Sequence, residues 1–158
     1  MPRGIVRHPL NGDPEDVVLE YSAALPIKRI HRFAVSPDGS QIALSGWSWD
    51  GTTSLLVIKD ASGVRELARR TQPELIVAQA WSPNGQFVAF TTLRFNQSTP
   101  HELWRVPAAG GEATRVGLSI PGATQLNPMA FSPTGSALAY TTGTPLQELW
   151  MMENFLPK

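Results

Sequence analysis

The stretch FAVSPDGSQIAL, residues 33–44, decides the fold of this chain, because its pattern returns twice further along. The turn at its centre, Ser-Pro-x-Gly, begins at residue 36 and recurs at 82 and 132, each time between two short apolar runs. The units therefore repeat after 46 and 50 residues. A repeat of this length is typical of the four-stranded blades of β-propellers.

The repeated turn has a physical reason for each of its residues. Proline presets φ at the second turn position, and the final glycine lets the chain enter the next strand. Asp38 and Asn84 suit the third position, where short polar side chains tolerate unusual backbone angles. Because the serines recur with the turn, we interpret all twelve positions as turn structure and not as catalysis: Ser36, Pro37, Asp38, Gly39, Ser82, Pro83, Asn84, Gly85, Ser132, Pro133, Thr134 and Gly135.

Each unit reads as four strands. The apolar run before the turn is strand a, on the inside, and the run after it is strand b. Strand c is predicted at 54–58, 102–106 and 148–152, and a more polar strand d at 64–67 and 113–116. No window shows apolar residues at helical spacing, so we expect essentially no helix.

The front of the chain carries part of the same pattern. Residues 4–12 overlay without a gap on 102–110, and 16–18 fall on 114–116, so the chain begins at a strand c. We therefore predict an all-β chain, 1–158, folded as one partial β-propeller domain with about three four-stranded antiparallel blades and an N-terminal half-blade. The expected bounds are 4–20 for the half-blade, 30–70 and 75–118 for two blades, and 126–156 for an incomplete one.

Composition narrows the function. Thirteen basic residues balance thirteen acidic ones, which argues against a nucleic-acid partner or an anionic membrane surface. Cysteine is absent, so disulfides, thiolate metal sites and cysteine nucleophiles are excluded. No apolar stretch approaches 18 residues, so we expect no direct membrane insertion. Residues 1–10 lack the apolar core of a signal peptide.

The motifs resemble the TolB-like propeller repeat, a WD-like repeat without the Trp-Asp signature. The resemblance rests on Ser-Pro-Asp-Gly followed by Ile-Ala-Leu, on the later Glu-Leu-Trp, and on the Gly-Gly-Glu-Ala-Thr-Arg turn at 110–115, and covers about residues 4–156. Such propellers include a periplasmic Tol-Pal component and sensory modules of bacterial winged-helix regulators or protein kinases. They also resemble the gating propeller of prolyl oligopeptidase-type peptidases. The ending at 148–155 is similar to the final blade of a regulator- or kinase-attached propeller.

A partial ring has consequences for partners. Propellers close with four to eight blades, and about three and a third cannot close at ordinary blade angles. One reading is the C-terminal fragment of a six- or seven-bladed ring from a larger bacterial protein. Another is a homodimer that completes a six-bladed ring, with the partner's strand at 17–18 finishing the third blade. An irregular monomer is a third reading.

Chemistry-bearing residues are few. The three histidines, His8, His31 and His101, share no short spacing, so a zinc pair is not indicated. His8 falls on a strand c position and reads as packed or at the rim, and His101 opens a strand c and reads as solvated. The carboxylates at 13, 15 and 16 cluster in a turn and read as solvated. No nucleophile elbow or phosphate loop is found, so we expect no enzyme activity, no metal and no cofactor.

The best binding candidates are aromatic and charged residues near strand ends. Residues 49–50 enter the b–c loop of the first blade and 94–96 occupy the same place in the second, where the b–c and d–a loops share one face. His31 precedes strand a near the funnel where propellers bind ligands. The candidates are His31, Trp49, Asp50, Arg94, Phe95 and Asn96. The competing interpretation for Trp47 and Trp49 is core packing; we read Trp81, Trp104 and Trp150 as core.

We expect a non-catalytic protein-interaction or ligand-sensing module whose partner is a protein or peptide. An accessory gating propeller of a hydrolase, or a structural gene fragment without independent function, remains the alternative. The location is expected to be periplasmic if the full-length protein carries an export signal or membrane anchor, and cytoplasmic otherwise.

Overall fold

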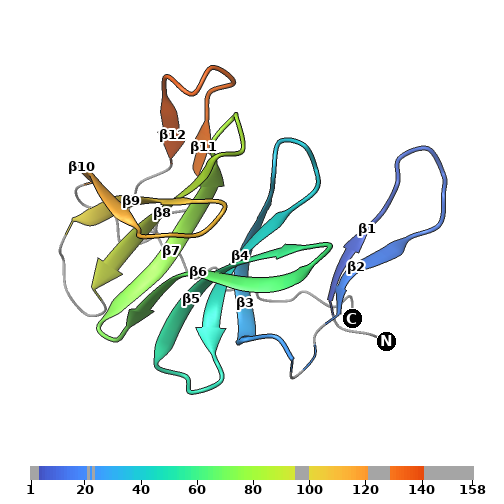
Figure 1. Ribbon diagram of the computed structural model, residues 1–158, viewed down its shortest axis with the longest axis horizontal. Coiled ribbons are helices and arrows are strands. Elements are labelled where there is room, and N and C mark those ends of the chain that lie inside the picture. Colours follow the sequence, from blue (N-terminus) through green and yellow to red (C-terminus); the bar gives the residue numbers. More distant parts are fainter. Residues whose placement is uncertain (1–3, 21, 23, 95–99, 121–128, 141–158) are drawn as a thin grey trace, which may run out of the picture.

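The computed structural model describes residues 4–20, 22, 24–94, 100–120 and 129–140, and the regular structure in these ranges is β-strand without helix (Figure 1). The chain runs through four antiparallel sheets in sequence order, which we call the half-blade, blade 1, blade 2 and blade 3. The half-blade holds β1 (Gly4–Arg7) and β2 (Asp16–Glu20). Blade 3 is described by β11 (Met129–Phe131) and β12 (Leu138–Tyr140).

The two complete blades are four-stranded meanders, with neighbouring strands paired in sequence order. Blade 1 consists of β3 (Ile27–Val35), β4 (Ile42–Ser48), β5 (Thr53–Asp60) and β6 (Gly63–Thr71). Blade 2 consists of β7 (Glu74–Trp81), β8 (Phe87–Arg94), β9 (His101–Pro107) and β10 (Thr114–Ile120). The predicted fold class, all-β with four-stranded antiparallel blades behind a half-blade, is confirmed, and the arrangement is compatible with a partial propeller.

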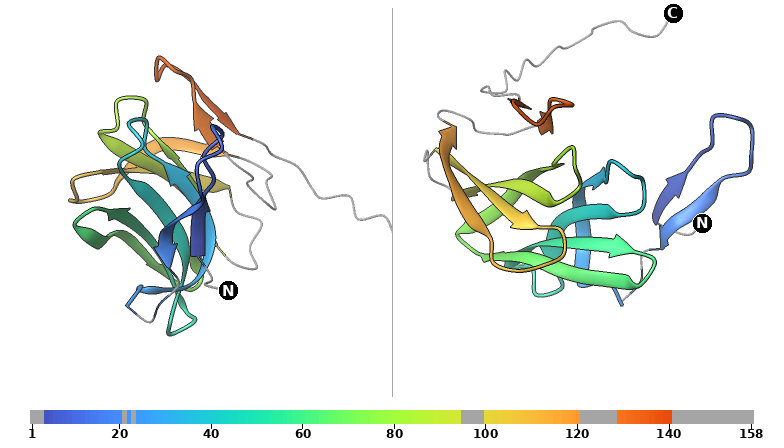
Figure 2. Two further views of the ribbon diagram at one scale, coloured as in Figure 1. Left: turned by 90° about the vertical axis from the view of Figure 1, so that its right-hand side faces the viewer. Right: turned by 45° about the horizontal axis from the view of Figure 1, so that its top comes forward.

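Three apolar clusters join the sheets face to face. The first lies between half-blade and blade 1 and includes Leu19 and Leu44. A second, with Leu56 and Phe90, joins blades 1 and 2, and a third, with Ala89 and Met129, joins blades 2 and 3. The row of sheets begins with the β1–β2 hairpin and ends with the β11–β12 hairpin (Figure 2).

Alternate residues of one strand enter different clusters. In β5, Leu55 and Val57 pack toward the half-blade, whereas Leu56 and Ile58 pack toward blade 2. Side chains of a strand point alternately to opposite sheet faces, so a strand buried on both faces must be apolar throughout. This is why the run at 55–58 shows no polar alternation.

The Ser-Pro-x-Gly turns share one set of hydrogen bonds. The Ser36 hydroxyl donates to Asp38 Oδ1 at 2.6 Å and accepts from the amide of Gln41 at 2.9 Å. In blade 2 the Ser82 hydroxyl donates to Asn84 and accepts from the amide of Phe87 at 3.0 Å. The third turn repeats the contact with the amide of residue 137, and each turn glycine has φ between 68° and 75°. The sequence repeat is thus a repeat of hydrogen bonds.

Successive turns also touch. A Cβ added at Gly85 would lie 3.9 Å from the Pro37 ring, and one added at Gly135 would lie 3.6 Å from the Pro83 ring. The glycine of each later turn therefore faces the proline of the turn before it.

The overlay of the half-blade on blade 2 holds in three dimensions. Arg7 pairs with Asp16 across β1 and β2, and the equivalent Arg105 pairs with Thr114 across β9 and β10. Both cross-strand pairs carry a side-chain hydrogen bond from the arginine Nε. A register shift interrupts the c–d pairing in the half-blade and in both complete blades.

The structure corrects the extent of strand a. This strand begins at residue 27 in blade 1 and at 74 in blade 2, well before the apolar runs that predicted it. In blade 1 the early part contains Lys28, Arg29 and Arg32, and such polar residues hide a strand from a search for apolar runs. His31 therefore lies within strand a and not before it. The predicted strand c at 148–152, with Trp150, falls outside the described residues.

Candidate functional site

Trp49 stands at the b–c end of blade 1 and is exposed to 51% of its surface. Its indole N–H donates to the backbone carbonyl of Leu25 at 2.8 Å, in the connection that leads into blade 1. Lys28 Nζ lies 6.0 Å from the ring centroid. The core interpretation of Trp49 is therefore wrong, because one edge is held by the neighbouring loop while the rest faces solvent. The same hydrogen bond confirms that b–c and d–a connections share one end of the sheets.

Asp50 follows Trp49, but its side chain forms hydrogen bonds within the b–c turn. Its carboxylate accepts from the Ser48 hydroxyl at 2.6 Å and from the amides of Thr52 and Thr53. These hydrogen bonds, the one from Ser48 foremost, hold the pKa of Asp50 far below its usual range. We therefore assign Asp50 to the b–c turn, where its charge is already paired with donors.

Arg94 ends β8 at the same end of the sheets, in blade 2. Its Nη2 lies 3.4 Å from Glu74 Oε1, beside a second ion pair, Arg115–Glu102, at 2.8 Å. These four residues line a pocket of about 360 Å³. The arginine is thus part of a polar pocket, with its charge matched by a neighbour. Phe95 and Asn96 lie outside the described residues.

His31 lies in β3, the inner strand of blade 1, and is exposed. Its ring meets Trp47 edge to face, with centroids 6.1 Å apart. Desolvation, with the charges of Arg29 and Arg32, lowers the pKa of His31. Trp47 itself is partly buried, so it is neither a fully buried core residue nor a fully exposed surface residue. The candidates therefore do not converge: His31 lies within a strand, and the described loop candidates divide between two blades.

Of the other two histidines, His101 differs from expectation, whereas His8 agrees with the predicted rim position. His101 was expected to be solvated, yet it is only 1% exposed, at the place where β9 meets β10 and pairs with Ile120. His8 lies just past the end of β1, exposed, with Nδ1 2.9 Å from Glu15 Oε1. The carboxylates of that turn are solvated, as expected, since Asp16 and its partner Arg7 are also exposed.

The remaining tryptophans belong to the core. Trp81 is 7% exposed, and its indole N–H donates across blades to the carbonyl of Ala34 at 2.9 Å. Trp104 is partly buried, packs against the cluster between blades 1 and 2, and stacks on Phe90 with centroids 6.5 Å apart. The core interpretation is confirmed for Trp81 and holds in part for Trp104.

A larger groove lies at the opposite end of the sheets, between the repeated turns of blades 1 and 2. It has a volume of about 820 Å³. Its walls are the two Ser-Pro turns and the c–d turn of blade 2, and residues lining it include Pro37, Asp38, Gln41, Arg65, Pro83 and Gln86. We call it the Arg65 groove.

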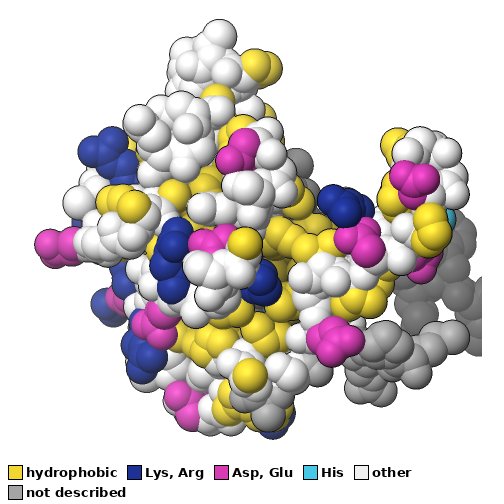
Figure 3. All heavy atoms as spheres, turned by 45° about the vertical axis from the view of Figure 1, so that its right-hand side comes forward, with side chains coloured by type: hydrophobic (Ala, Val, Ile, Leu, Met, Phe, Trp, Pro, Cys, Tyr) yellow, Lys and Arg dark blue, Asp and Glu magenta, His cyan; other side chains and the backbone are white. Residues whose placement is uncertain are grey.

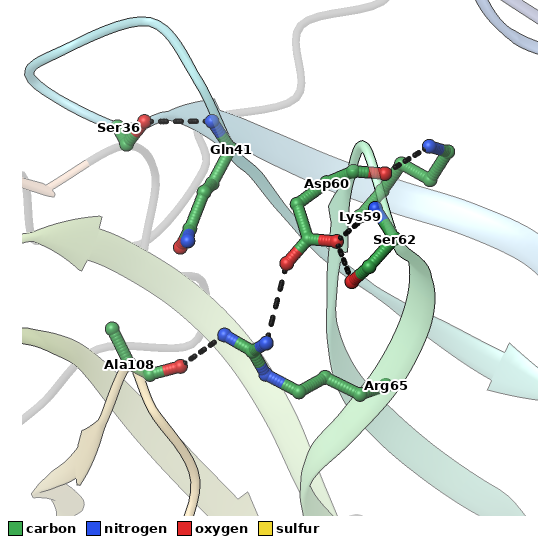
Figure 4. Close-up of polar contacts among 7 residues, drawn as sticks. All are labelled: Ser36, Gln41, Lys59, Asp60, Ser62, Arg65 and Ala108. Atoms are coloured by element: carbon green, nitrogen blue, oxygen red, sulfur yellow. Dashed lines mark hydrogen bonds and ion pairs between the residues drawn. The ribbon is translucent and has the colours of Figure 1, made fainter.

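Arg65 supplies the cation of this groove (Figure 4). From β6, its Nη1 lies 3.2 Å from Asp60 Oδ2, and its Nη2 donates to the carbonyl of Ala108 in blade 2 at 2.5 Å. Its Nε is buried and has no hydrogen-bond partner among the described residues. Gln41 projects from the other side of this space, and its side-chain amide makes no hydrogen bond to any described residue. The groove therefore presents the side-chain amide of Gln41, which its own walls do not use.

Two carboxylates balance the charge of Arg65. The hydroxyls of Ser36 and Ser40 donate to Asp38 and lower its pKa to about 2. Hydrogen bonds from the Ser62 hydroxyl and amide, with a smaller contribution from Arg65, lower the pKa of Asp60. Both carboxyls are ionised near neutral pH, so the Arg65 groove is not a cationic site.

The equivalent groove between blades 2 and 3 is smaller, about 420 Å³. Phe87 and Phe131 meet there edge to face with centroids 5.8 Å apart. The sequence contained a signal for both grooves, namely consecutive Ser-Pro turns one blade apart. Our interpretation of those turns as purely structural missed the space that they enclose.

Comparison with known proteins gives no relative for this chain: neither a family model nor a curated protein matches it. In the described part of the chain, no group of three or more histidine, aspartate or glutamate side chains is placed to hold a metal ion. No helix long and apolar enough to span a membrane occurs among the described residues.

Proposed function

We propose that this chain is a non-catalytic interaction module of the TolB-like propeller type, which binds an extended, polar but uncharged peptide segment in the Arg65 groove. The observation that carries the proposal is the groove itself, which combines a volume of about 820 Å³ with the unused amide of Gln41 and the guanidinium of Arg65. Ligand sites are typically clefts of about 300–1,000 Å³ with a few convergent polar groups.

The charges of the groove favour a neutral ligand. Asp38 and Asp60 offset Arg65, so a phosphate or a strongly acidic segment would meet two carboxylates. An extended peptide offers one carbonyl and one N–H per residue, which suits side-chain amides and a guanidinium. The walls formed by Pro37 and Pro83 add apolar contact without mobile side chains.

The hydrogen bonds of the repeated serines also support a binding function over a catalytic one. The hydroxyls of Ser36 and Ser82 each donate to a turn side chain and accept from a backbone amide. A hydroxyl engaged in this way is a turn element, which agrees with a scaffold role. The resemblance of the repeat to TolB-like propellers adds the expectation of a protein or peptide partner.

The test is selection of peptides from a phage-displayed library on the whole chain, followed by calorimetry of the enriched peptide with variants. Gln41→Ala removes a side chain that makes no hydrogen bond to described residues, so the fold is retained. We expect it to weaken binding about fivefold to tenfold, the worth of one hydrogen bond. Trp49→Ala, at the opposite end of the sheets, is the matched control and leaves affinity unchanged.

Two results contradict the proposal. Failure to enrich any peptide removes the binding function. Binding that is lost in Trp49→Ala and kept in Gln41→Ala moves the site to the b–c end, where His31, Trp49 and Arg94 were first predicted to act.

A further inference from the structure

An asparagine or aspartate stands directly before a glycine at four places in the chain, residues 11–12, 38–39, 50–51 and 84–85. In such a pair the glycine nitrogen can reach the side-chain carbonyl carbon, because glycine has no Cβ to obstruct the approach. Attack by this nitrogen on an asparagine expels the side-chain amide, and asparagine is accordingly one of the thermolabile residues. The sequence alone therefore offers two asparagines, Asn11 and Asn84, that could react in this way.

Three of the four pairs are held by one shared set of hydrogen bonds. The glycine N–H donates to the backbone carbonyl of a serine three residues earlier, at 2.9 to 3.1 Å. The hydroxyl of the same serine donates to the asparagine or aspartate side chain, at 2.6 to 2.8 Å. The serines are Ser36, Ser48 and Ser82, and the glycines are Gly39, Gly51 and Gly85. Because a nitrogen must give up its proton to attack, an N–H that is donated to a carbonyl is a poor nucleophile.

The two aspartates among these three pairs have a second protection. Their hydrogen bonds, the one from the serine hydroxyl foremost, lower the pKa of Asp38 to about 2 and hold the pKa of Asp50 far below its usual range. Both side chains are therefore ionised near neutral pH. A carboxylate that carries negative charge on both oxygens resists a nucleophile, so Asn84 has the one electrophilic side chain among the three held pairs.

The pair Asn11–Gly12 lies in the turn between β1 and β2 and lacks these hydrogen bonds. Pro9 occupies the position at which the other pairs have their serine. The Gly12 N–H makes no hydrogen bond to any described residue, whereas the equivalent Gly110 donates to Pro107 at 2.9 Å. Asn11 and Gly12 are both exposed, and Figure 3 shows the β1–β2 hairpin projecting from the body with acidic side chains on it.

Asp13 holds the side chain of Asn11 in the turn. Its backbone N–H donates to Asn11 Oδ1 at 3.2 Å, and its Oδ2 accepts from Asn11 Nδ2 at 2.7 Å. Negative charge develops on Oδ1 when the Gly12 nitrogen attacks, and a donor aimed at that oxygen stabilises it. Asn84 has a similar donor, the amide of Gln86 at 3.1 Å. The two asparagines therefore differ in the glycine N–H and in the serine hydroxyl.

We infer that Asn11 is a site of spontaneous deamidation in the folded chain and that Asn84, although it also precedes a glycine, is protected. The Gly12 nitrogen forms a bond to Asn11 Cγ and loses its proton to water. The Cγ–Nδ2 bond breaks, and the side-chain nitrogen takes up a proton and leaves as ammonia. Water then opens the cyclic imide at either carbonyl, which gives aspartate or isoaspartate.

The product changes the turn between β1 and β2. A carboxylate replaces the amide that donates to Asp13, so the turn loses a hydrogen bond and gains a contact between like charges. This modification goes beyond the proposed function, because the turn is not among the residues that line the Arg65 groove.

Peptide mapping of the wild-type chain tests the inference. The folded protein is kept in mildly alkaline buffer and digested with trypsin, which places Asn11 in the peptide 8–28 and Asn84 in the peptide 71–94. Mass spectrometry then follows the conversion of amide to acid in each peptide. We expect Asn11 to react about thirtyfold faster than Asn84, the worth of the two hydrogen bonds that must break first. In urea the two rates become similar, because the unfolded chain lacks these hydrogen bonds.

The inference is overturned by equal rates in the folded chain, by a faster reaction at Asn84, or by an Asn11 that reacts in urea alone. Two serine variants test the cause. Ser82→Ala removes the hydroxyl that holds Asn84 and is expected to accelerate its reaction about fivefold, the worth of one hydrogen bond, with no change at Asn11. Ser132→Ala removes the same hydroxyl from a turn with Thr134 in place of asparagine and leaves both rates unchanged. Equal acceleration in both variants would mean that general unfolding sets the rate, and would also overturn the inference.

Discussion

At the scale of single residues, the turn serines show how one hydroxyl stabilises a blade. Ser82 is 1% exposed and satisfies both a side chain and the backbone amide of Phe87. A buried amide that loses its acceptor keeps the full cost of its desolvation, about 1–3 kcal/mol. Ser82 is thus expected to contribute more to the free energy of unfolding than an exposed residue of the same turn.

Ser82→Ala is therefore expected to lower the free energy of unfolding by about 1–3 kcal/mol. Ser132→Ala removes the same hydroxyl from a more exposed turn, where water replaces it, and costs less. Urea unfolding of both variants measures the difference. Equal losses in the two variants would show that burial does not set the cost.

In blade 1 the equivalent hydroxyl, that of Ser36, lowers the pKa of the Asp38 carboxyl. The pKa of Asp38 is lowered to about 2 from 3.8, so the ionised form is favoured in the folded state. Its contribution to stability is present above the unfolded pKa and is lost as the pH falls through about 2. Ser36→Ala removes the largest cause, and the pKa is expected to move back toward 3.8. Titration of the carboxyl carbon by NMR measures both values; an Asp38 that titrates normally in the wild type contradicts the assignment.

At the scale of elements, close approach of two strands explains a glycine in blade 1. A Cβ at Gly46 would lie 2.0 Å from the carbonyl oxygen of Arg29 and 2.8 Å from Ile27 Cγ2. The pairing of β3 with β4 shifts register at this place. Strand a can therefore bend across strand b only because residue 46 has no side chain.

Gly46→Ala is expected to destabilise the chain by about 2 kcal/mol or more, since backbone must move to admit the methyl group. Gly51→Ala is the control: its φ is +73° but no atom lies within 4 Å of the added Cβ, so only backbone strain of about 1 kcal/mol is incurred. Thermal unfolding compares the two. A smaller loss for Gly46→Ala than for Gly51→Ala would contradict the steric account.

Elements also mark what sequence could and could not predict. In the described residues, the turns, the strands b, the strands c of the two complete blades and the half-blade register were predictable, because a repeated pattern of apolar residues and turn residues reports local structure. The early part of strand a was not, since Lys28, Arg29 and Arg32 carry no apolar signal. The burial of His101 was missed because burial depends on how strands pack and not on the local sequence pattern.

The candidate site was harder to predict for the same reason. Trp49 was correctly placed near a loop, but its hydrogen bond to Leu25 joins residues that are 24 positions apart, and no local pattern encodes it. The Arg65 groove joins Gln41, Arg65 and Ala108, which are distant in sequence and belong to two blades. A repeat predicts what each unit looks like; the spaces between units depend on how they pack.

At the scale of the whole molecule, one contact between turns recurs from blade to blade. The contact between Gly85 and Pro37, repeated by Gly135 and Pro83, has a consequence for how such a chain can grow. Each Ser-Pro-x-Gly turn supplies a proline that contacts the next turn and a glycine that leaves room for the proline of the turn before it. Both residues of the contact are therefore encoded in the same repeat. An in-frame tandem copy thus arrives already matched to its neighbours on either side. Lengthening or shortening the array then requires no compensating change elsewhere, and the angle from one sheet to the next is inherited with the copy.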